Sequence, residues 1–156
     1  MKKIFLIFPN QLFKINKQFK EFKNIALIQD SLFFGSDSQW KQKFHCQKII
    51  FHQATMDYYE ENLKNKGLNV IYIKHKKDTR TEDNLTDLVA EGFNHFTTYE
   101  PFDWSLEKRL KNFSSKNNIK LEILKSEMFI TCPKIYEEII NQKKIYGMQK
   151  FYKIQR

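Results

Sequence analysis

Side chains that form hydrogen bonds or titrate stand directly after the apolar runs of this sequence. Pro9, Asn10 and Gln11 follow the first run, Asp30 follows the second, and Glu100 follows the fourth. Amide and carboxylate groups of this kind suit the hydrogen-bonding edge of a small molecule better than a polyphosphate. We therefore treat these five residues as candidate ligand contacts.

Aromatic and basic side chains lie close to these polar groups in the sequence. Phe33 and Phe34 come shortly after the second run, and His45, Lys48 and His52 lie at the start of a helical stretch. Together with the amides and carboxylates they would form a site for a flat heteroaromatic ligand. Each group also has an ordinary structural interpretation: the amides as a polar turn, the phenylalanines and histidines as core, and Glu100 as a strand exit.

Several kinds of catalytic or phosphate-binding motif are absent from the sequence. The four glycines, at positions 35, 67, 92 and 147, cannot build a G-x-G-x-x-G loop, a Walker loop or a G-x-S-x-G elbow. His45 and His52 are two helical turns apart, roughly 10 Å along the axis, too far to share one metal ion. Cys46 is expected to have a structural role, and we predict neither catalytic residues nor a metal site.

Five apolar runs alternate with helical stretches, which predicts an α/β fold with a parallel five-stranded sheet and helices on both faces. The predicted strand order is 3-2-1-4-5. The predicted strands are residues 4–8, 24–28, 68–73, 93–99 and 119–124, and the predicted helices are residues 43–65, 82–91 and 104–117. Ligands of such sheets bind beyond the carboxyl ends of the strands, which is where the candidate residues fall.

The predicted helix at residues 43–65 is apolar over an unusually wide arc. One stripe contains Phe44, Ile50, Phe51, Ala54 and Tyr58, and an adjoining stripe contains His45, Ile49, His52, Met56, Tyr59 and Leu63. A helix that only covers a sheet needs a narrower arc. We expect this helix to contact the sheet and also a second helix, a partner or a small molecule.

Length and composition indicate a single folded domain. The chain has 156 residues, of which 41% are hydrophobic, and a formal net charge of +9. Only three of its 27 basic residues are arginine, and the lysines are scattered, so direct nucleic-acid binding is kept as an alternative only. The two cysteines are far apart and no apolar run is long enough for a membrane span or a signal peptide. We expect a cytoplasmic protein with reduced thiols and no membrane association.

Seven short segments occur in an order that is recognisable. They are Phe8–Leu12 (FPNQL), Asp30–Phe34 (DSLFF), Phe44–Lys48 (FHCQK), Phe51–Met56 (FHQATM), Tyr99–Trp104 (YEPFDW), Met128–Phe129 and Met148–Lys153 (MQKFYK). With these segments the chain resembles the amino-terminal domain of the deoxyribodipyrimidine photolyase-related proteins. These are the bacterial cryptochromes and (6-4) photolyases that carry an iron–sulfur cluster.

The resemblance implies a Rossmann-like domain that binds a ribityl-lumazine antenna chromophore. The antenna would pass its excitation to a reduced flavin, and the FAD and the 4Fe-4S cluster would belong to a helical carboxyl-terminal domain that repairs DNA or signals. By resemblance, the Pro9–Gln11 loop, Asp30 with Phe33 and Phe34, and the helix face near His45 and His52 would line the antenna pocket.

The chain departs from the family pattern at several positions. The family loop commonly reads G-D-Q-L, whereas this chain has Pro9-Asn10-Gln11-Leu12, so an amide replaces a carboxylate. Cys46 and Gln53 stand where basic residues are expected.

We predict an antenna-binding domain at residues 1–133 and the start of a linker or helical region at residues 134–156. A flavin-binding domain or partner would complete it, and any contact with DNA would be indirect. Alone, the chain would be inactive as a DNA photolyase. The alternatives are a chromophore-free interaction module of the same fold and a small basic nucleic-acid-binding protein.

Overall fold

The computed structural model describes residues 2–14, 21–126, 128, 137, 149, 152 and 153. Its elements are β1 (Lys3–Ile7), β2 (Asn24–Ile28), α1 (Ser31–Phe34), α2 (Cys46–Asn65), β3 (Asn69–Ile73), α3 (Thr81–Ala90), β4 (His95–Tyr99), α4 (Trp104–Lys116) and β5 (Lys120–Leu124). Every predicted strand agrees with an observed strand to within two residues at each end.

The chain divides into two compact units, residues 1–125 and residues 126–156. In the second unit the Ser126 hydroxyl accepts a hydrogen bond from the Met128 amide at 3.2 Å. Gln149, Tyr152 and Lys153 are helical, but most of this unit lies outside the described residues. The predicted boundary between residues 133 and 134 also lies outside them.

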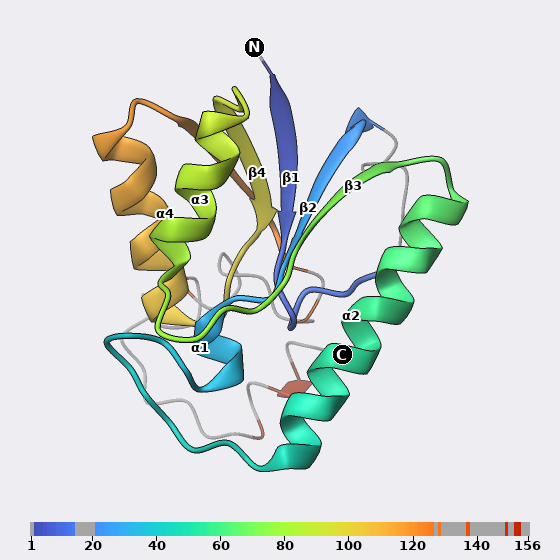
Figure 1. Cartoon of the computed structure of the whole chain (residues 1–156), viewed down its shortest axis with the longest axis vertical. Helices are drawn as coiled ribbons and strands as arrows, with labels where there is room; N and C mark the ends of the chain where they lie inside the picture. The colour runs from blue at the N-terminus through green and yellow to red at the C-terminus, as the bar shows by residue number, and fades with distance from the viewer. Residues whose placement is uncertain are drawn as a thin grey trace. The chain divides into compact units, whose positions relative to one another are not determined.

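The five strands of the first unit form one parallel sheet in the order β3-β2-β1-β4-β5, which confirms the predicted α/β fold and strand order. β1 lies at the centre, with Phe5 beside Ile25 of β2 on one side and Thr97 of β4 on the other. All carboxyl ends therefore meet at one edge of the sheet, where α1 lies (Figure 1). Residues 15–20, between the two first strands, lie outside the described part of the chain.

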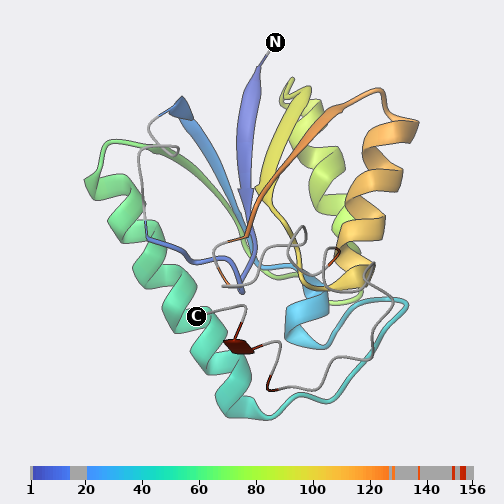
Figure 2. The same cartoon turned by 180° about the vertical axis from the view of Figure 1, so that it is seen from behind.

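Helices cover both faces of the sheet, as the continuous apolar runs predict (Figures 1 and 2). Successive side chains of a strand point to opposite faces, so Ile4 and Leu6 of β1 enter one core and Phe5 and Ile7 the other. The first core is completed by Leu85 and Leu88 of α3 and by Leu106, Leu110 and Phe113 of α4. The second core is completed by Met56, Tyr59 and Leu63 of α2.

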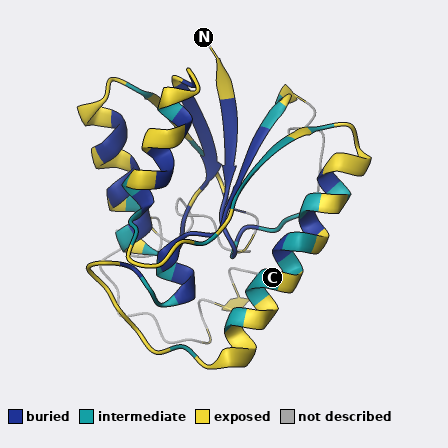
Figure 3. Ribbon diagram, in the orientation of Figure 1, coloured by how far each residue is buried: buried dark blue, intermediate teal, exposed yellow. Residues whose placement is uncertain are grey.

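Helix α2 begins at Cys46, three residues later than predicted. The His45 side chain caps it, because its Nδ1 atom accepts a hydrogen bond from the Gln47 amide at 3.3 Å. Of the two predicted apolar stripes, the one ending at Leu63 faces the sheet. Most of the other stripe is exposed: Ile50, Phe51 and Tyr58 are 63%, 65% and 69% exposed. Figure 3 shows exposed residues along much of α2.

A single helical turn, α1, follows β2 and was not predicted from the sequence. The Asp30 carboxylate caps it by accepting a hydrogen bond from the Leu32 amide at 3.0 Å. Gly35 ends it with φ +73°, and a Cβ atom there would lie 2.3 Å from the Gln42 carbonyl oxygen. The Gln42 amide also donates a hydrogen bond to the Gly35 carbonyl at 3.0 Å, and the segment between α1 and α2 runs as a wide loop beyond α1 to the start of α2 (Figure 2).

Candidate functional site

A hollow of about 400 Å³ opens at the carboxyl-terminal edge of the sheet. It lies where the chain order reverses on either side of β1, the place at which open parallel sheets bind ligands. We call it the larger hollow. Its lining residues are Asn10, Leu32, Phe33, Trp40, Gln42, Phe44, Lys48, His52, Phe102, Asp103 and Ser105.

Four of the ten predicted site residues line the larger hollow: Asn10, Phe33, Lys48 and His52. Both polar atoms of the Asn10 amide are buried and have no hydrogen-bond partner among the described residues. The Nδ1 atom of His52 is also buried and has no hydrogen-bond partner among the described residues. Because buried polar groups normally find partners, these atoms are available to a ligand.

The electrostatics of His52 favour a neutral imidazole. Burial, and then the Lys48 ammonium, lower the pKa of this histidine below its ordinary value of 6.5. A neutral imidazole has one donor and one acceptor nitrogen, so it offers a ligand either kind of hydrogen bond. The Lys48 ammonium itself lies 3.5 Å from the centre of the Phe44 ring, which keeps that cation over an aromatic face.

The remaining predicted residues of the first loop have a positioning role. The buried Gln11 side chain donates to the Tyr99 carbonyl at 2.8 Å and accepts from the Phe8 amide and the Thr98 hydroxyl, each at 3.3 Å. Pro9 is buried beside it. These bonds tie the turn after β1 to the end of β4, and so fix the position of Asn10 between them.

Asp30 and Phe34 are buried and do not line the larger hollow. Phe34 is buried and stacks on His75, with ring centres 4.8 Å apart. Asp30 is fully buried as the cap of α1, and burial raises the pKa of its carboxyl to about 6 despite the opposing Leu32 amide, Thr81 hydroxyl and Arg109 charge. His45 and Glu100 are exposed and do not line the larger hollow.

Several lining residues were not among the predicted site residues. They are Leu32, Trp40, Gln42, Phe44, Phe102, Asp103 and Ser105. Trp40 is the least predictable of them, because it lies in a segment without regular structure. The sequence offers one indication that Trp40 belongs to a site: it is a large apolar residue among polar loop residues, and no local structure explains it. Phe102 and Asp103 directly follow Glu100-Pro101 at the same strand end.

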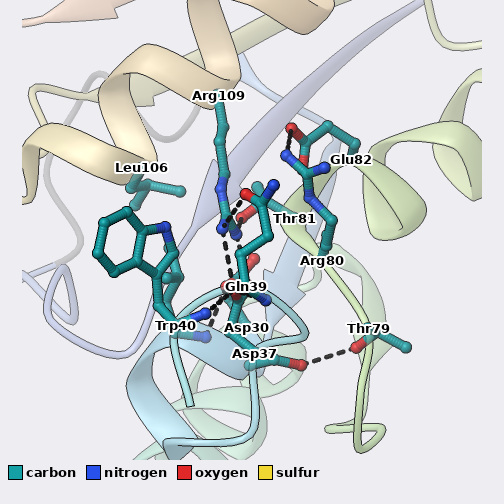
Figure 4. A network of polar contacts seen from close by, with 12 residues as sticks. Asp30, Asp37, Gln39, Trp40, Thr79, Arg80, Thr81, Glu82, Leu106 and Arg109 are labelled. Atoms are coloured by element: carbon teal, nitrogen blue, oxygen red, sulfur yellow. Dashed lines mark hydrogen bonds and ion pairs between the residues drawn. The ribbon is translucent and has the colours of Figure 1, made fainter. Parts of the chain in front are cut away.

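A buried ion pair holds the loop that presents Trp40 (Figure 4). Both terminal nitrogens of Arg109 on α4 donate to the Asp37 carboxylate, at 2.6 and 3.0 Å. The Asp37 Oδ1 atom also accepts hydrogen bonds from the Gln39 and Trp40 amides, each at 2.9 Å. The Trp40 side chain is 56% exposed, so a buried network here holds the backbone of a residue whose side chain faces solvent.

A second hollow, of about 170 Å³, lies on the other side of Trp40. We call it the smaller hollow. It is lined by Gln39, Trp40, Arg80, Glu82, Trp104, Ser105, Lys108, Arg109 and Asn112. Trp40 and Ser105 line both hollows and form the ridge between them.

The described residues contain neither a candidate metal site nor a candidate membrane span. Within these parts of the chain, no three His, Cys, Asp or Glu side chains come together in a group that could hold a metal ion. No helix in the same parts has the length and apolar character needed to cross a membrane.

Two similarities to known proteins bear on the family of this chain. The family model of the deoxyribodipyrimidine photo-lyase-related proteins matches residues 5–156. Uncharacterized protein R852 of Acanthamoeba polyphaga mimivirus is 34% identical over 136 residues, an alignment that covers 83% of this chain and 67% of the viral protein. Since the family model matches almost the whole chain, this protein belongs to the deoxyribodipyrimidine photo-lyase-related protein family.

Proposed function

We propose that the larger hollow binds a planar antenna chromophore of the ribityl-lumazine class. The observation that carries this proposal is the buried Asn10 amide, which has no hydrogen-bond partner among the described residues and lines an aromatic-walled hollow at the switch point of the sheet. Family membership supports it, because the resemblance implies an antenna in this domain.

The lining residues fit such a group. Phe33, Trp40, Phe44 and Phe102 supply flat apolar surfaces on which a bicyclic ring can pack. The Asn10 amide both donates and accepts, which matches the alternating donors and acceptors along the edge of a heteroaromatic ring. When bound, the chromophore would supply absorption of near-ultraviolet or blue light.

The chain's own contribution would be to hold the ring, exclude water and fix its orientation. Gln11 ties the Asn10 turn to β4, and the Asp37–Arg109 pair fixes the Trp40 wall. Transfer of excitation depends on a fixed angle between donor and acceptor, so rigid walls suit an antenna better than mobile ones. The acceptor would be a flavin held by another domain or polypeptide, where any repair of DNA would take place.

The test is a titration of the purified chain with a ribityl lumazine, followed by fluorescence anisotropy of the chromophore. We expect saturable binding with a Kd of about 10 μM or tighter, in the range of a well-lined pocket. The variant His52→Trp, which would fill the hollow, should abolish binding while circular dichroism shows the fold intact. Absence of binding to the folded wild-type chain at about 100 μM, some tenfold above that Kd, would refute the proposal.

A further inference from the structure

Three exposed aromatic side chains gather at the carboxyl-terminal edge of the sheet. Trp40, Phe102 and Trp104 are 56%, 53% and 67% exposed, and each lines one or both of the two hollows. They come from different segments, the loop after α1 and the turn that leads from β4 into α4. Exposed aromatics that converge from separate parts of a chain mark a binding surface more often than an accident of packing.

Hydrogen bonds order the backbone that carries the two tryptophans, although their side chains face solvent. Trp40 is fixed by the hydrogen bond from its amide to the buried Asp37 carboxylate. Trp104 opens α4, whose first turn is capped by Asp103 through the Leu106 amide at 3.0 Å. A ligand that stacks on these indoles would therefore not have to order the backbone segments that carry them.

Uncompensated positive charge accompanies the indoles. The Lys108 ammonium lies 4.6 Å from the centre of the Trp104 ring and forms no salt bridge with any described residue. The single carboxylate in the smaller hollow, Glu82, is already paired with Arg80 at 2.8 Å. Arg109 is paired with Asp37. Lys108 thus leaves an excess positive charge beside an aromatic face.

The smaller hollow also contains both hydrogen-bond donors and hydrogen-bond acceptors. The Gln39 and Asn112 amides line it, and each can donate and accept. The Arg80 Nε atom and the Glu82 Oε2 atom have no hydrogen-bond partner among the described residues. Amides, guanidinium groups and carboxylates are the side chains that read the edges of nucleobases.

We propose that the smaller hollow and its two tryptophans bind single-stranded nucleic acid. One base would stack on the indoles, and its phosphate would contact Lys108. Single strands expose the faces of their bases, whereas a duplex hides them, so aromatic side chains beside a cation favour the single strand. The chain's net charge of +9 would attract a polyanion to the protein, and Lys108 supplies positive charge at this edge. The two proposed sites share Trp40 and Ser105, but Trp104 and Lys108 do not line the larger hollow, so variants of these two residues test this proposal separately from chromophore binding.

The experiment is a titration of a fluorescein-labelled thymidine 12-mer with the full chain, read by fluorescence anisotropy in low salt. We expect a Kd on the order of 10 μM, in the range of electrostatically driven binding. Trp104→Ala should weaken binding about tenfold, the loss typical of one base–aromatic stack. Lys108→Ala should weaken it and reduce the slope of log K against log salt by about 0.7, the value for one phosphate contact in a single strand.

Matched variants separate this site from diffuse electrostatics. Lys111→Ala removes the same charge from α4, but Lys111 is paired with Glu107 and lines neither hollow. Phe51→Ala removes an aromatic side chain of α2 that is 65% exposed. Both variants should bind as the wild type does. Unchanged affinity in Trp104→Ala, equal losses in Lys108→Ala and Lys111→Ala, or no binding of the 12-mer at about 100 μM would each overturn the proposal.

Two further ligands test the choice of a single strand. A duplex of the same length should bind at least tenfold more weakly at matched salt, because its bases are not free to stack. Thymidine monophosphate should bind far more weakly than the 12-mer. If the duplex binds as tightly, or if the mononucleotide accounts for the whole affinity, a single-strand surface is refuted.

Discussion

Both terminal nitrogens of Arg109 donate hydrogen bonds to the carboxylate of Asp37, a residue 72 positions away in the sequence. Neither side chain is more than 6% exposed. Burial by itself would raise the pKa of Asp37. The Arg109 guanidinium and the Gln39 and Trp40 amides outweigh that effect, so the pKa lies below its ordinary value of 3.8. The pair joins α4 to the loop that separates the two hollows.

We expect Asp37→Asn to destabilise the protein by about 3–5 kcal/mol at neutral pH, because it leaves the Arg109 charge buried without a counterion. A carboxyl with a lowered folded-state pKa contributes its stability above the unfolded pKa and loses it as the pH falls through the folded value. The loss of stability in Asp37→Asn should therefore be largest above about pH 4.5 and become smaller in more acidic solution. Urea unfolding at several pH values measures it.

The control is Glu107→Gln, which breaks the exposed pair of Glu107 with Lys111 on the same helix. It should cost less than about 1 kcal/mol. Equal costs for the two variants would show that burial of the Asp37–Arg109 pair has no energetic consequence.

The second buried carboxyl, Asp30, should have the opposite dependence on pH. Its pKa is raised to about 6, chiefly by burial, so the folded protein keeps a proton that the unfolded chain releases near pH 3.8. Folded molecules therefore bind more protons between these values, and stability falls as the pH rises through the window. Asn at this position keeps the cap on the Leu32 amide but does not titrate.

We expect the stability of Asp30→Asn, relative to the wild type, to rise by about 2–3 kcal/mol between pH 4 and pH 7. Paired urea titrations across this range measure the difference, in which the contributions of other groups cancel. Parallel curves for the two proteins would contradict a raised pKa.

Asn10 should govern affinity for the chromophore without governing stability. Asn10→Ala removes an amide that bonds to no described residue, so we expect the melting temperature to change little. Loss of one or two neutral hydrogen bonds to the ligand should weaken ribityl-lumazine binding about three- to tenfold. The control is Asn112→Ala, which removes an amide from the smaller hollow alone. Equal affinity of the Asn10 variant and the wild type would place the ligand elsewhere.

Gly35 should be the least replaceable of the three described glycines, all of which have positive φ. In Gly35→Ala the new methyl group would meet the Gln42 carbonyl at 2.3 Å in addition to the left-handed strain, whereas at Gly67 it meets nothing within 4 Å. We expect the free energy of unfolding to fall by more than about 2 kcal/mol in Gly35→Ala and by about 1 kcal/mol in Gly67→Ala.

The same substitution should disturb the loop that presents Trp40. The chain has two tryptophans, so in a Trp104→Phe background only Trp40 emits. Its emission should change in Gly35→Ala and stay unchanged in Gly67→Ala. Identical spectra and equal stabilities would show that the loop adapts to the methyl group without cost.

The two sides of α2 should respond differently to truncation. Met56 is fully buried against the sheet, and Met56→Ala should cost about 2–5 kcal/mol. Phe51 is 65% exposed, and Phe51→Ala should change stability by less than about 0.5 kcal/mol. Thermal unfolding of both variants tests which stripe faces the core, and a reversed order would contradict the observed orientation of the helix.

The sequence by itself determined that the fold is a parallel sheet between helices. Continuous apolar runs such as Ile4–Phe8 must be buried on both faces, and only a parallel sheet between helices buries them so. It also placed Asn10, Phe33, Lys48 and His52 near one edge, because each lies just beyond a strand end or at the start of the following long helix. Hydrophobic periodicity is a local property of the sequence, so it predicts the strands, the helices and the residues that follow each strand.

Only the tertiary structure decided which stripe of α2 faces the sheet, because both stripes are apolar and periodicity cannot rank them. It also decided that Asp30 caps a helical turn while Asn10 stays without a partner among the described residues. It also brought Arg109 to Asp37 and the Gln42 carbonyl so close to Gly35 that a Cβ atom there would clash. Contacts between residues so far apart in the chain leave no periodic trace in the sequence, since their geometry exists only after the elements pack.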